Sequence, residues 1–313
     1  MLMVRKFIVG VDVGGTNIKA ALVENGRIKQ RIKLPTMANF GTSRSIEQIK
    51  SAIQPLISSA SGIGIGIAGI IDSKKGVVRF SPNFKDWSNV ELTKLLEKEF
   101  KKPVKILNDV DAICLGEWQY GAARDYKNVF LFTLGTGVGG AAICEGKPLF
   151  GANNFAGEIG HTTIKYDGPK CVCGNYGCLE RYVGARYIVA LAKRRINKEK
   201  SSLKKLKDLT PENIGREANK GDRIAKEIFS EVGYYIGIGI ANIVNLFDPD
   251  IIVISGGIAR AGRILFEPIR KTVTKRIMGL KYRDYRIVPT KLADDAGVLG
   301  AVYYVSEVKP KVI

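Results

Sequence analysis

The chain has 313 residues, 45% of them hydrophobic and 25% charged, which excludes a disordered or fibrous protein and allows about two domains. The net charge of +19 is high, yet no helix-turn-helix, two-histidine zinc finger or aromatic stacking platform accompanies it, so we expect no nucleic-acid partner. No stretch reaches the roughly 18 apolar residues of a membrane span, and Asp12 interrupts the N-terminal apolar run too early for a signal peptide. We therefore expect a cytoplasmic protein without a membrane partner.

The first third of the chain alternates between strand and helix patterns. Short apolar runs bounded by glycine or polar residues predict strands, and apolar residues at helical spacing predict helices. Ser88 and Asn89 are candidate caps for one of these helices. The expected strands are at 7–13, 20–23, 63–71 and 105–109, and the expected helices are at 43–60, 89–100 and 110–122.

A second hairpin repeats the plan of the first one. The apolar run 129–134 leads into a glycine turn, and a strand resumes at 141–144. Asp12 aligns with Thr133, and Gly14 with Gly135. An internal repeat at this distance predicts two related α/β lobes.

The second half of the chain also alternates between helix and strand, which favours a parallel or mixed sheet. The basic segment 193–207 lies within this half and contains no aromatic residue, and its role stays open. The expected helices are at 181–196, 221–247, 261–278 and 296–308, and the expected strands are within 248–257 and near 285–289.

The two glycine turns are candidate phosphate sites. Gly135, Gly137 and Gly140 have the spacing of a dinucleotide-binding loop, but a strand rather than a helix follows them, and no Walker loop is present. Glycine turns nevertheless let backbone N–H groups approach phosphate closely. Thr16 and Thr136 can add hydroxyl donors, and Asp12 is a candidate ligand of Mg2+. The alternative for either turn alone is a plain β-turn.

His161 is the only histidine of the chain, and three of the five cysteines, Cys171, Cys173 and Cys178, follow it closely. Three thiolates and one imidazole make a complete tetrahedral zinc site with no open position, which predicts a structural metal. Buried cysteines without a metal are the alternative. Cys114 and Cys144 are interpreted as core residues. The carboxylates of Glu158 and Glu180 flank the cluster and are placed to face a polar ligand.

These motifs together resemble the ROK family of sugar kinases, within the actin-like and hexokinase-like ATPase superfamily, over almost the whole chain. Residues 12–16 resemble the first phosphate loop of the family, and residues 134–140 the second. Residues 158–161, with the three cysteines and Glu180, resemble the family's sugar and zinc segment, and residues 79–83 with Asp86 and Trp87 resemble a segment of ROK glucokinases.

The resemblance implies a two-lobed actin-like/hexokinase-like (ribonuclease H-like) α/β fold with an internal duplication. It places a small domain at 1–112, with a closing helix at 297–313 packing back on it, and a large domain with the zinc loop at 113–296. It also implies a dimer or a tetramer, although no feature of the sequence itself indicates the oligomeric state.

The activity implied is ATP- and Mg2+-dependent phosphorylation of glucose at the 6-hydroxyl. Asp109, at the end of a predicted strand, is the candidate general base, and a helix N-cap is its structural alternative. Asp111 falls on another face of the next helix. The implied sugar-binding residues are Asn83, Asn108, Asp109, Glu158, His161 and Glu180, the implied zinc ligands are His161, Cys171, Cys173 and Cys178, and the implied nucleotide-binding residues are Asp12, Gly14, Gly15, Thr16, Gly135, Thr136, Gly137, Gly256 and Gly257.

Three alternatives to a glucokinase stay open. An N-acetylmannosamine or N-acetylglucosamine kinase would share the segment 158–161 and the zinc loop, and a broad-specificity hexokinase would share the whole site. A non-catalytic sugar sensor belongs to a different class of protein. No helix-turn-helix precedes residue 7, so the sequence departs from the repressor branch of the family.

Overall fold

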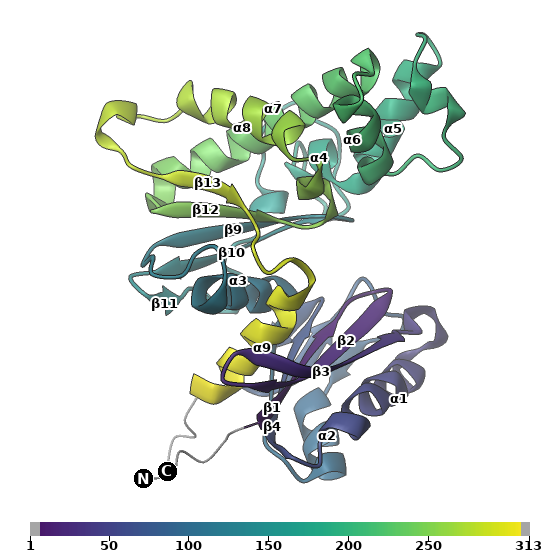
Figure 1. The fold of residues 1–313 in the computed structure, drawn as a ribbon, viewed down its shortest axis with the longest axis vertical. Helices are drawn as coiled ribbons and strands as arrows, with labels where there is room; N and C mark the ends of the chain where they lie inside the picture. The colour runs from purple at the N-terminus through teal and green to yellow at the C-terminus, as the bar shows by residue number, and fades with distance from the viewer. Residues whose placement is uncertain (1–6, 308–313) are drawn as a thin grey trace. The chain divides into compact units, whose positions relative to one another are not determined.

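The computed structural model describes residues 7–307, which divide into two compact units (Figure 1). The first unit contains residues 7–125, 148–156 and 291–307, and the second contains residues 126–147 and 157–290. Helix α3 (Asp109–Tyr120), which spans the expected boundary at residue 112, lies wholly within the first unit. The expected closing helix extends to residue 313, and its residues 308–313 lie outside the described part of the chain.

The first unit is built on a five-stranded mixed sheet. Strands β1 and β2 form the expected antiparallel hairpin, and β1, β4 and β8 run parallel to one another. Strand β3 was not expected. It is an edge strand whose basic residues face solvent, so it carries a weak hydrophobic pattern. The order across the sheet is β3 (Arg27–Pro35), β2 (Asn17–Glu24), β1 (Phe7–Val13), β4 (Ala60–Ile67) and β8 (Val104–Asn108).

A small antiparallel sheet contains residues that were expected in the strand at 63–71 and in the helix at 89–100. Ser88 and Asn89, expected as helix caps, belong to β7 instead, because Ser88 pairs with Phe80 and Val90 with Val78. The predicted helix therefore starts later, and the predicted helix at 43–60 ends before Pro55, which cannot continue it. The elements are α1 (Thr42–Ile53), β5 (Ile70–Asp72), β6 (Val77–Phe80), β7 (Ser88–Val90) and α2 (Leu92–Phe100).

Helix α9 (Ala296–Glu307) comes from the end of the chain and packs on β1, β4 and α3. The contact is so close that a Cβ atom on Gly64 would lie 2.0 Å from the carbonyl oxygen of Ala301, and one on Gly300 would lie 1.7 Å from that of Ala112. Only glycine fits at these two positions. Ile8 and Val23 of the sheet share a small apolar cluster with Val298 and other residues of the helix. The larger core of the unit lies elsewhere and includes residues of α1 and α2.

A buried carboxylate lies where the chain leaves the first unit and where it returns. Glu117 in α3 is fully buried, and its carboxylate accepts a hydrogen bond from the N–H of Ala122 at 2.7 Å. It also accepts from the N–H groups of Lys291 and Leu292, at 3.1 and 2.8 Å. Three backbone donors satisfy the charge that burial would otherwise leave unpaired.

The second unit repeats the strand order of the first. Strands β9 and β10 form an antiparallel hairpin, and β9, β12 and β13 run parallel, as β1, β4 and β8 do. The order across the sheet is β11 (Lys147–Pro148), β10 (Val138–Cys144), β9 (Val129–Leu134), β12 (Ile251–Ser255) and β13 (Arg286–Pro289). The matched order is the structural form of the internal repeat.

Helices α7 and α8 pack against each other beside this sheet (Figure 1). The expected helix at 181–196 is divided in two at Gly184, and the helix α6 was not expected. Among residues 7–307, no helix is both long and apolar enough to cross a membrane. The helices of the unit are α4 (Glu180–Val183), α5 (Ala185–Ile196), α6 (Pro211–Asn219), α7 (Arg223–Phe247) and α8 (Arg263–Thr274).

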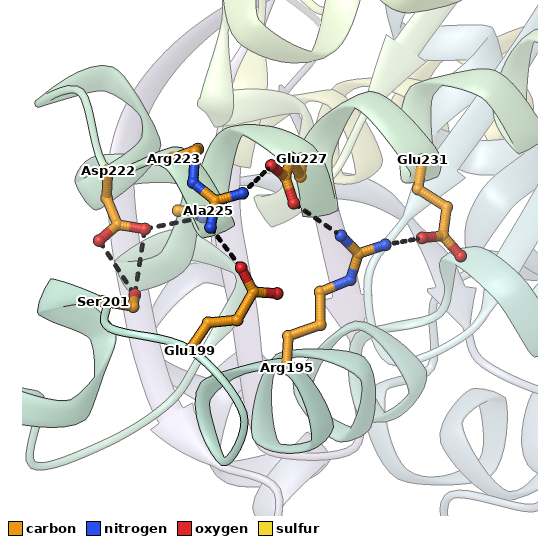
Figure 2. A network of polar contacts seen from close by, with 8 residues as sticks. All are labelled: Arg195, Glu199, Ser201, Asp222, Arg223, Ala225, Glu227 and Glu231. Carbon is orange, nitrogen blue, oxygen red and sulfur yellow. Dashed lines mark hydrogen bonds and ion pairs between the residues drawn. The ribbon is translucent and has the colours of Figure 1, made fainter.

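A network of ion pairs fixes the basic segment 193–207 to α7 (Figure 2). Arg195 bonds to Glu227 at 3.1 Å and to Glu231 at 2.5 Å. Arg223 bonds to Glu227 at 2.5 Å and pairs with Glu199. The segment is therefore an ordered part of the second unit.

Candidate active site

The first glycine turn follows β1 and is closed by its own backbone. The N–H of Gly14 donates to the carbonyl of Asn17 at 3.0 Å, and the hydroxyl of Thr36 donates to the carbonyl of Gly14 at 2.6 Å. Gly15 and Thr16 are exposed at the tip. A Cβ atom on Gly15 would lie 3.4 Å from that of Asn83, so the structure brings the predicted phosphate turn and a predicted sugar residue together.

Asp12 lies at the end of β1 beside this turn. Its side chain is 18% exposed, and Lys19 Nζ lies 3.9 Å from its Oδ2. A Cβ atom on Gly297 would lie 3.0 Å from its Cγ, so a glycine leaves the space that the carboxyl group occupies. Burial raises the pKa of Asp12 above the usual value, the charge of Lys19 opposes this effect, and Asp294 adds to it.

Asn108 ends β8 and Asp109 follows it, at the same edge of the sheet. Asn108 pairs in register with Ile67 of β4, and its side-chain amide donates to the carbonyl of Gly69 at 3.0 Å. Its Oδ1 accepts the N–H of Val110 at 2.8 Å, so Asn108 is the N-cap of α3. Asp109 is the first helical residue. The capping role considered for Asp109 therefore belongs to Asn108.

The second glycine turn is also closed by a backbone hydrogen bond, which spans two residues instead of three. The N–H of Gly135 donates to the carbonyl of Gly137 at 3.0 Å. Gly256 follows β12 with φ +95°, and a Cβ atom there would lie 2.2 Å from the carbonyl oxygen of Leu134. The two glycine segments predicted to contact the nucleotide in this unit are thus in direct contact near the ends of β9 and β12.

Glu180 also reaches this turn. Its Oε2 accepts the N–H of Val138 at 3.1 Å, and a Cβ atom on Gly137 would lie 2.6 Å from the same oxygen. The sequence assigned Glu180 to the sugar only. The structure adds a contact with the predicted phosphate turn, through the carboxylate of a residue that is 9% exposed.

Glu158 precedes a single turn of 3-10 helix that packs on β10. A Cβ atom on Gly160 would lie 2.0 Å from the carbonyl oxygen of Val138, which leaves room for no other residue. Glu158 is exposed and lines a cavity of about 540 Å3 whose other walls are mostly apolar. Those walls come from Phe130, Gly157, Ile159, Thr162, Asn242, Ile243, Asn245, Leu246 and Phe247.

The structure brings His161 and the three cysteines of the loop together. Their four ligand atoms lie within 4.8 Å of one another. Cys171 Sγ lies 3.8 Å from His161 Nδ1, and Cys173 Sγ lies 3.7 Å from Cys178 Sγ. Zinc–sulfur bonds of about 2.3 Å in a tetrahedron place two sulfur atoms about 3.8 Å apart. The Cys173–Cys178 distance is therefore compatible with a zinc site.

The thiols of the cluster differ in acidity. A hydrogen bond from the backbone of Asn175 is the main cause that lowers the pKa of Cys173. Burial, together with the adjacent thiols of Cys173 and Cys171, raises the pKa of Cys178 to about 12. Since metal ligands must be deprotonated, a bound cation would have to displace the proton of Cys178.

Asn175 supports the loop and was missed by the sequence analysis. Its carbonyl accepts the N–H of Cys171 at 2.7 Å, and its side-chain amide donates to the carbonyl of His161 at 3.2 Å. The pair Gly174–Asn175 is a typical turn signal, and it lies between the cysteine ligands.

Each unit thus gathers one part of the predicted site. Asp12, Gly14, Gly15, Thr16, Asn83, Asn108 and Asp109 lie at one edge of the first sheet. Gly135, Thr136, Gly137, Gly256, Gly257, Glu158, His161 and Glu180 lie in the second unit, near the second glycine turn or on the segment that packs on β10.

Comparison with known proteins assigns nearly the whole chain to one protein family. The model of the ROK family matches residues 8–308. A glucokinase from Thermotoga maritima is 38% identical over 308 residues, which cover 96% of this chain and 97% of the relative.

Two solved structures have the same fold. The ROK family glucokinase from Streptomyces griseus, in complex with glucose and AMPPNP, has a TM-score of 0.81 at 31% identity, over 95% of this chain and 98% of that chain. A ROK family transcriptional regulator, a homologue of the Escherichia coli MLC protein, has a TM-score of 0.86 at 27% identity, over 96% of this chain and 77% of that one. These similarities confirm the predicted fold class.

Proposed function

Because the chain belongs to the ROK family, we propose that it transfers the γ-phosphoryl group of ATP to the 6-hydroxyl of glucose. The observation that carries this proposal is the similarity to a glucokinase along nearly the full length of both chains. The edge of the first sheet supports it independently, because the candidate base Asp109, the amide of Asn108 and the glycine turn all lie at the ends of parallel strands there. Ligands of open α/β sheets bind at such strand ends.

Asp109 is the proposed general base. Phosphoryl transfer needs an acceptor for the proton of the attacking hydroxyl, together with positioning and neutralisation of the phosphate charges. Asp109 is half-buried at the first position of α3, where the cap on Asn108 fixes the backbone. Asn83 and Asn108 are the proposed partners of sugar hydroxyls in this unit.

The nucleotide is proposed to contact both glycine turns. In the first turn Gly14, Gly15 and Thr16 offer N–H and hydroxyl donors to phosphate, and Asp12 is the proposed partner of Mg2+, directly or through water. In the second unit the turn Gly135-Thr136-Gly137 is assigned to phosphate, and Gly256 and Gly257 are assigned to the adenosine.

The cysteine cluster is proposed to hold a structural zinc ion. The spacing of the four donors supports this role, and four protein ligands leave no position for a substrate. His161 faces Cys171 with Nδ1, which leaves Nε2 for a sugar hydroxyl. Glu158 and Glu180 are the other proposed sugar-binding residues. Zinc would thus fix the shape of the sugar-binding segment, and the chemistry belongs to Asp109.

The proposal is tested with purified protein and defined donors and sugars. We expect ADP release from ATP to depend on sugar and kcat/KM to be highest with glucose, ahead of N-acetylmannosamine, N-acetylglucosamine and mannose. A higher kcat/KM with an N-acetyl sugar would reassign the substrate, and similar values for several hexoses would indicate a broad hexokinase. Inorganic polyphosphate as donor tests whether the site requires a nucleotide.

Because the chain is also similar to a transcriptional regulator, the same experiments test a non-catalytic sugar sensor as the alternative function. A sugar sensor would bind glucose in calorimetry and release no ADP with any donor. A dimer or tetramer and a cytoplasmic location remain predictions, the first of which light scattering after size-exclusion chromatography measures directly.

A further inference from the structure

A negative charge lies against the second glycine turn. Glu180 Oε2 takes the N–H of Val138, so this donor is not available to a phosphate. The N–H groups of Thr136 and Gly137 donate to no other group within residues 7–307. A phosphate that binds them would approach the carboxylate of Glu180, and two negative charges at short range repel. The turn therefore needs a nearby cation to bind an anionic ligand.

Arg186 places a cation beside Glu180. Its Nη2 lies 3.7 Å from Glu180 Oε1, and its side chain is 50% exposed. This separation is longer than a direct hydrogen bond, so the guanidinium balances the charge of Glu180 while its N–H donors stay available. The guanidinium carbon lies 4.5 Å from the ring centroid of Tyr187, a distance at which a cation and an aromatic ring attract each other.

The backbone before Arg186 is attached to the turn. The N–H of Ala185, the first residue of α5, donates to the carbonyl of Gly135 at 2.9 Å. A Cβ atom on Gly184 would lie 3.2 Å from the carbonyl oxygen of Thr136. Arg186 is thus one residue away from a direct contact with the proposed phosphate turn, at the positive end of a helix.

We propose that Arg186 binds the phosphate groups of the nucleotide at the second glycine turn. This inference rests on the proposed kinase function. Without nucleotide Arg186 balances the charge of Glu180, and with nucleotide its free N–H donors bond to a phosphate oxygen. The guanidinium then lies between the carboxylate and the phosphate and removes their repulsion. A guanidinium suits this position better than an ammonium, because its donors point in several fixed directions.

The test compares Arg186→Gln and Arg186→Lys with the control Arg194→Gln. Arg194 lies on the same helix, is exposed and has no acidic partner among the described residues. We expect Arg186→Gln to raise the KM of MgATP, and its Kd measured by calorimetry without sugar, about tenfold, the loss of one charge-assisted hydrogen bond. The KM of glucose should stay within about twofold. Arg186→Lys should recover part of the loss, and Arg194→Gln should match the unmodified protein.

Other results would overturn the inference. A rise in the KM of glucose alone would mean that Arg186 acts on the sugar through Glu180, and no change in either KM would mean that it has no role in binding. The thermal midpoint of each variant shows whether Arg186→Gln folds, and Arg186→Lys carries the comparison if it does not. A protein that binds MgATP but does not phosphorylate glucose would contradict the proposed function, while the nucleotide Kd still tests Arg186.

Discussion

The side-chain amide of Asn108 lies 3.0 Å from the carbonyl oxygen of Gly69, and this hydrogen bond joins the start of α3 to the segment that follows β4. The other end of the same side chain caps the helix. One residue therefore fixes the backbone on which Asp109 stands.

Asp109→Asn is expected to lower kcat for glucose phosphorylation by a factor of about 10² to 10⁴, the range for loss of a general base. The carboxamide has nearly the same shape, and the cap on Asn108 is untouched, so the Kd of glucose should change little. The measurement is steady-state ADP release with saturating ATP. Asp111→Asn is the matched control in the same helical turn and should keep most of its activity. Full turnover by Asp109→Asn would show that the base is another group.

Cys173→Ser is expected to abolish a zinc content of about one ion per chain. A hydroxyl is a poor replacement for a thiolate ligand, and three remaining donors hold the ion weakly. Elemental analysis after dialysis measures the metal, and calorimetry should show a larger loss of affinity for glucose than for MgATP. Cys144→Ser, outside the cluster, should keep its zinc. Loss of MgATP affinity alone would contradict the assigned role.

Asp222→Ala is expected to lower the free energy of unfolding by about 1–2 kcal/mol, because Asp222 is the N-cap of α7. Its carboxylate accepts the N–H of Ala225 at 2.8 Å and that of Ser202 at 2.7 Å (Figure 2 shows the first bond). Denaturant unfolding at neutral pH measures the loss. Asp208→Ala, an exposed acid nearby, is the control and should cost less.

The same residue predicts a pH dependence. Burial tends to raise the pKa of Asp222, but hydrogen bonds from Ala225, Ser202 and Ser201 outweigh it, and the net pKa is lowered. A carboxyl group with a lowered pKa stabilises the fold fully above its unfolded value of about 3.9, and this stabilisation is lost as pH falls through the folded value. Asp222→Asn should therefore lose less stability than the unmodified protein on acidification below about pH 4. An equal loss of stability in both proteins would show that Asp222 does not cause the acid destabilisation.

Asp12→Asn is expected to raise the thermal midpoint in the absence of Mg2+ and nucleotide, and to abolish turnover. Burial raises the pKa of Asp12, so folding disfavours its ionised form, and stability decreases as pH rises from the unfolded towards the folded value. A neutral amide removes this cost at neutral pH. The stabilisation should be smaller when both proteins are compared below pH 4. A lower thermal midpoint of Asp12→Asn at neutral pH would show that the buried, ionised carboxyl group does not destabilise the fold.

The two hairpins and the metal cluster could be predicted because their signals are local. Glycine after a short apolar run marks the turn after β1, and a single histidine beside three cysteines is a rare set of residue types. The small sheet of β5–β7 could not be predicted, because Ser88 and Val90 become a strand only by pairing with residues of β6. Nothing within that segment itself indicates the partner.

The contact of Glu180 shows the same limit within the site. The spacing after Cys178 assigned this residue to a sugar, and no local pattern relates it to Val138, which lies 42 residues earlier in the chain. The structure shows that one carboxylate touches the predicted phosphate turn, and from this contact the role of Arg186 follows. Side chains that link distant segments are visible only once the chain is folded.

Helix α9 is synthesised after the second unit but belongs to the first, so the two units can complete their folding in a fixed order during synthesis. The helix belongs to the same unit as residues 7–125, and its close contact with Gly64 leaves an apolar strip of that sheet uncovered until residues 296–307 are made. The last strand of the second unit, β13, ends at Pro289, before α9 begins. On the ribosome, the inserted second unit can therefore finish folding first, while the unit that starts the chain must wait for its last helix.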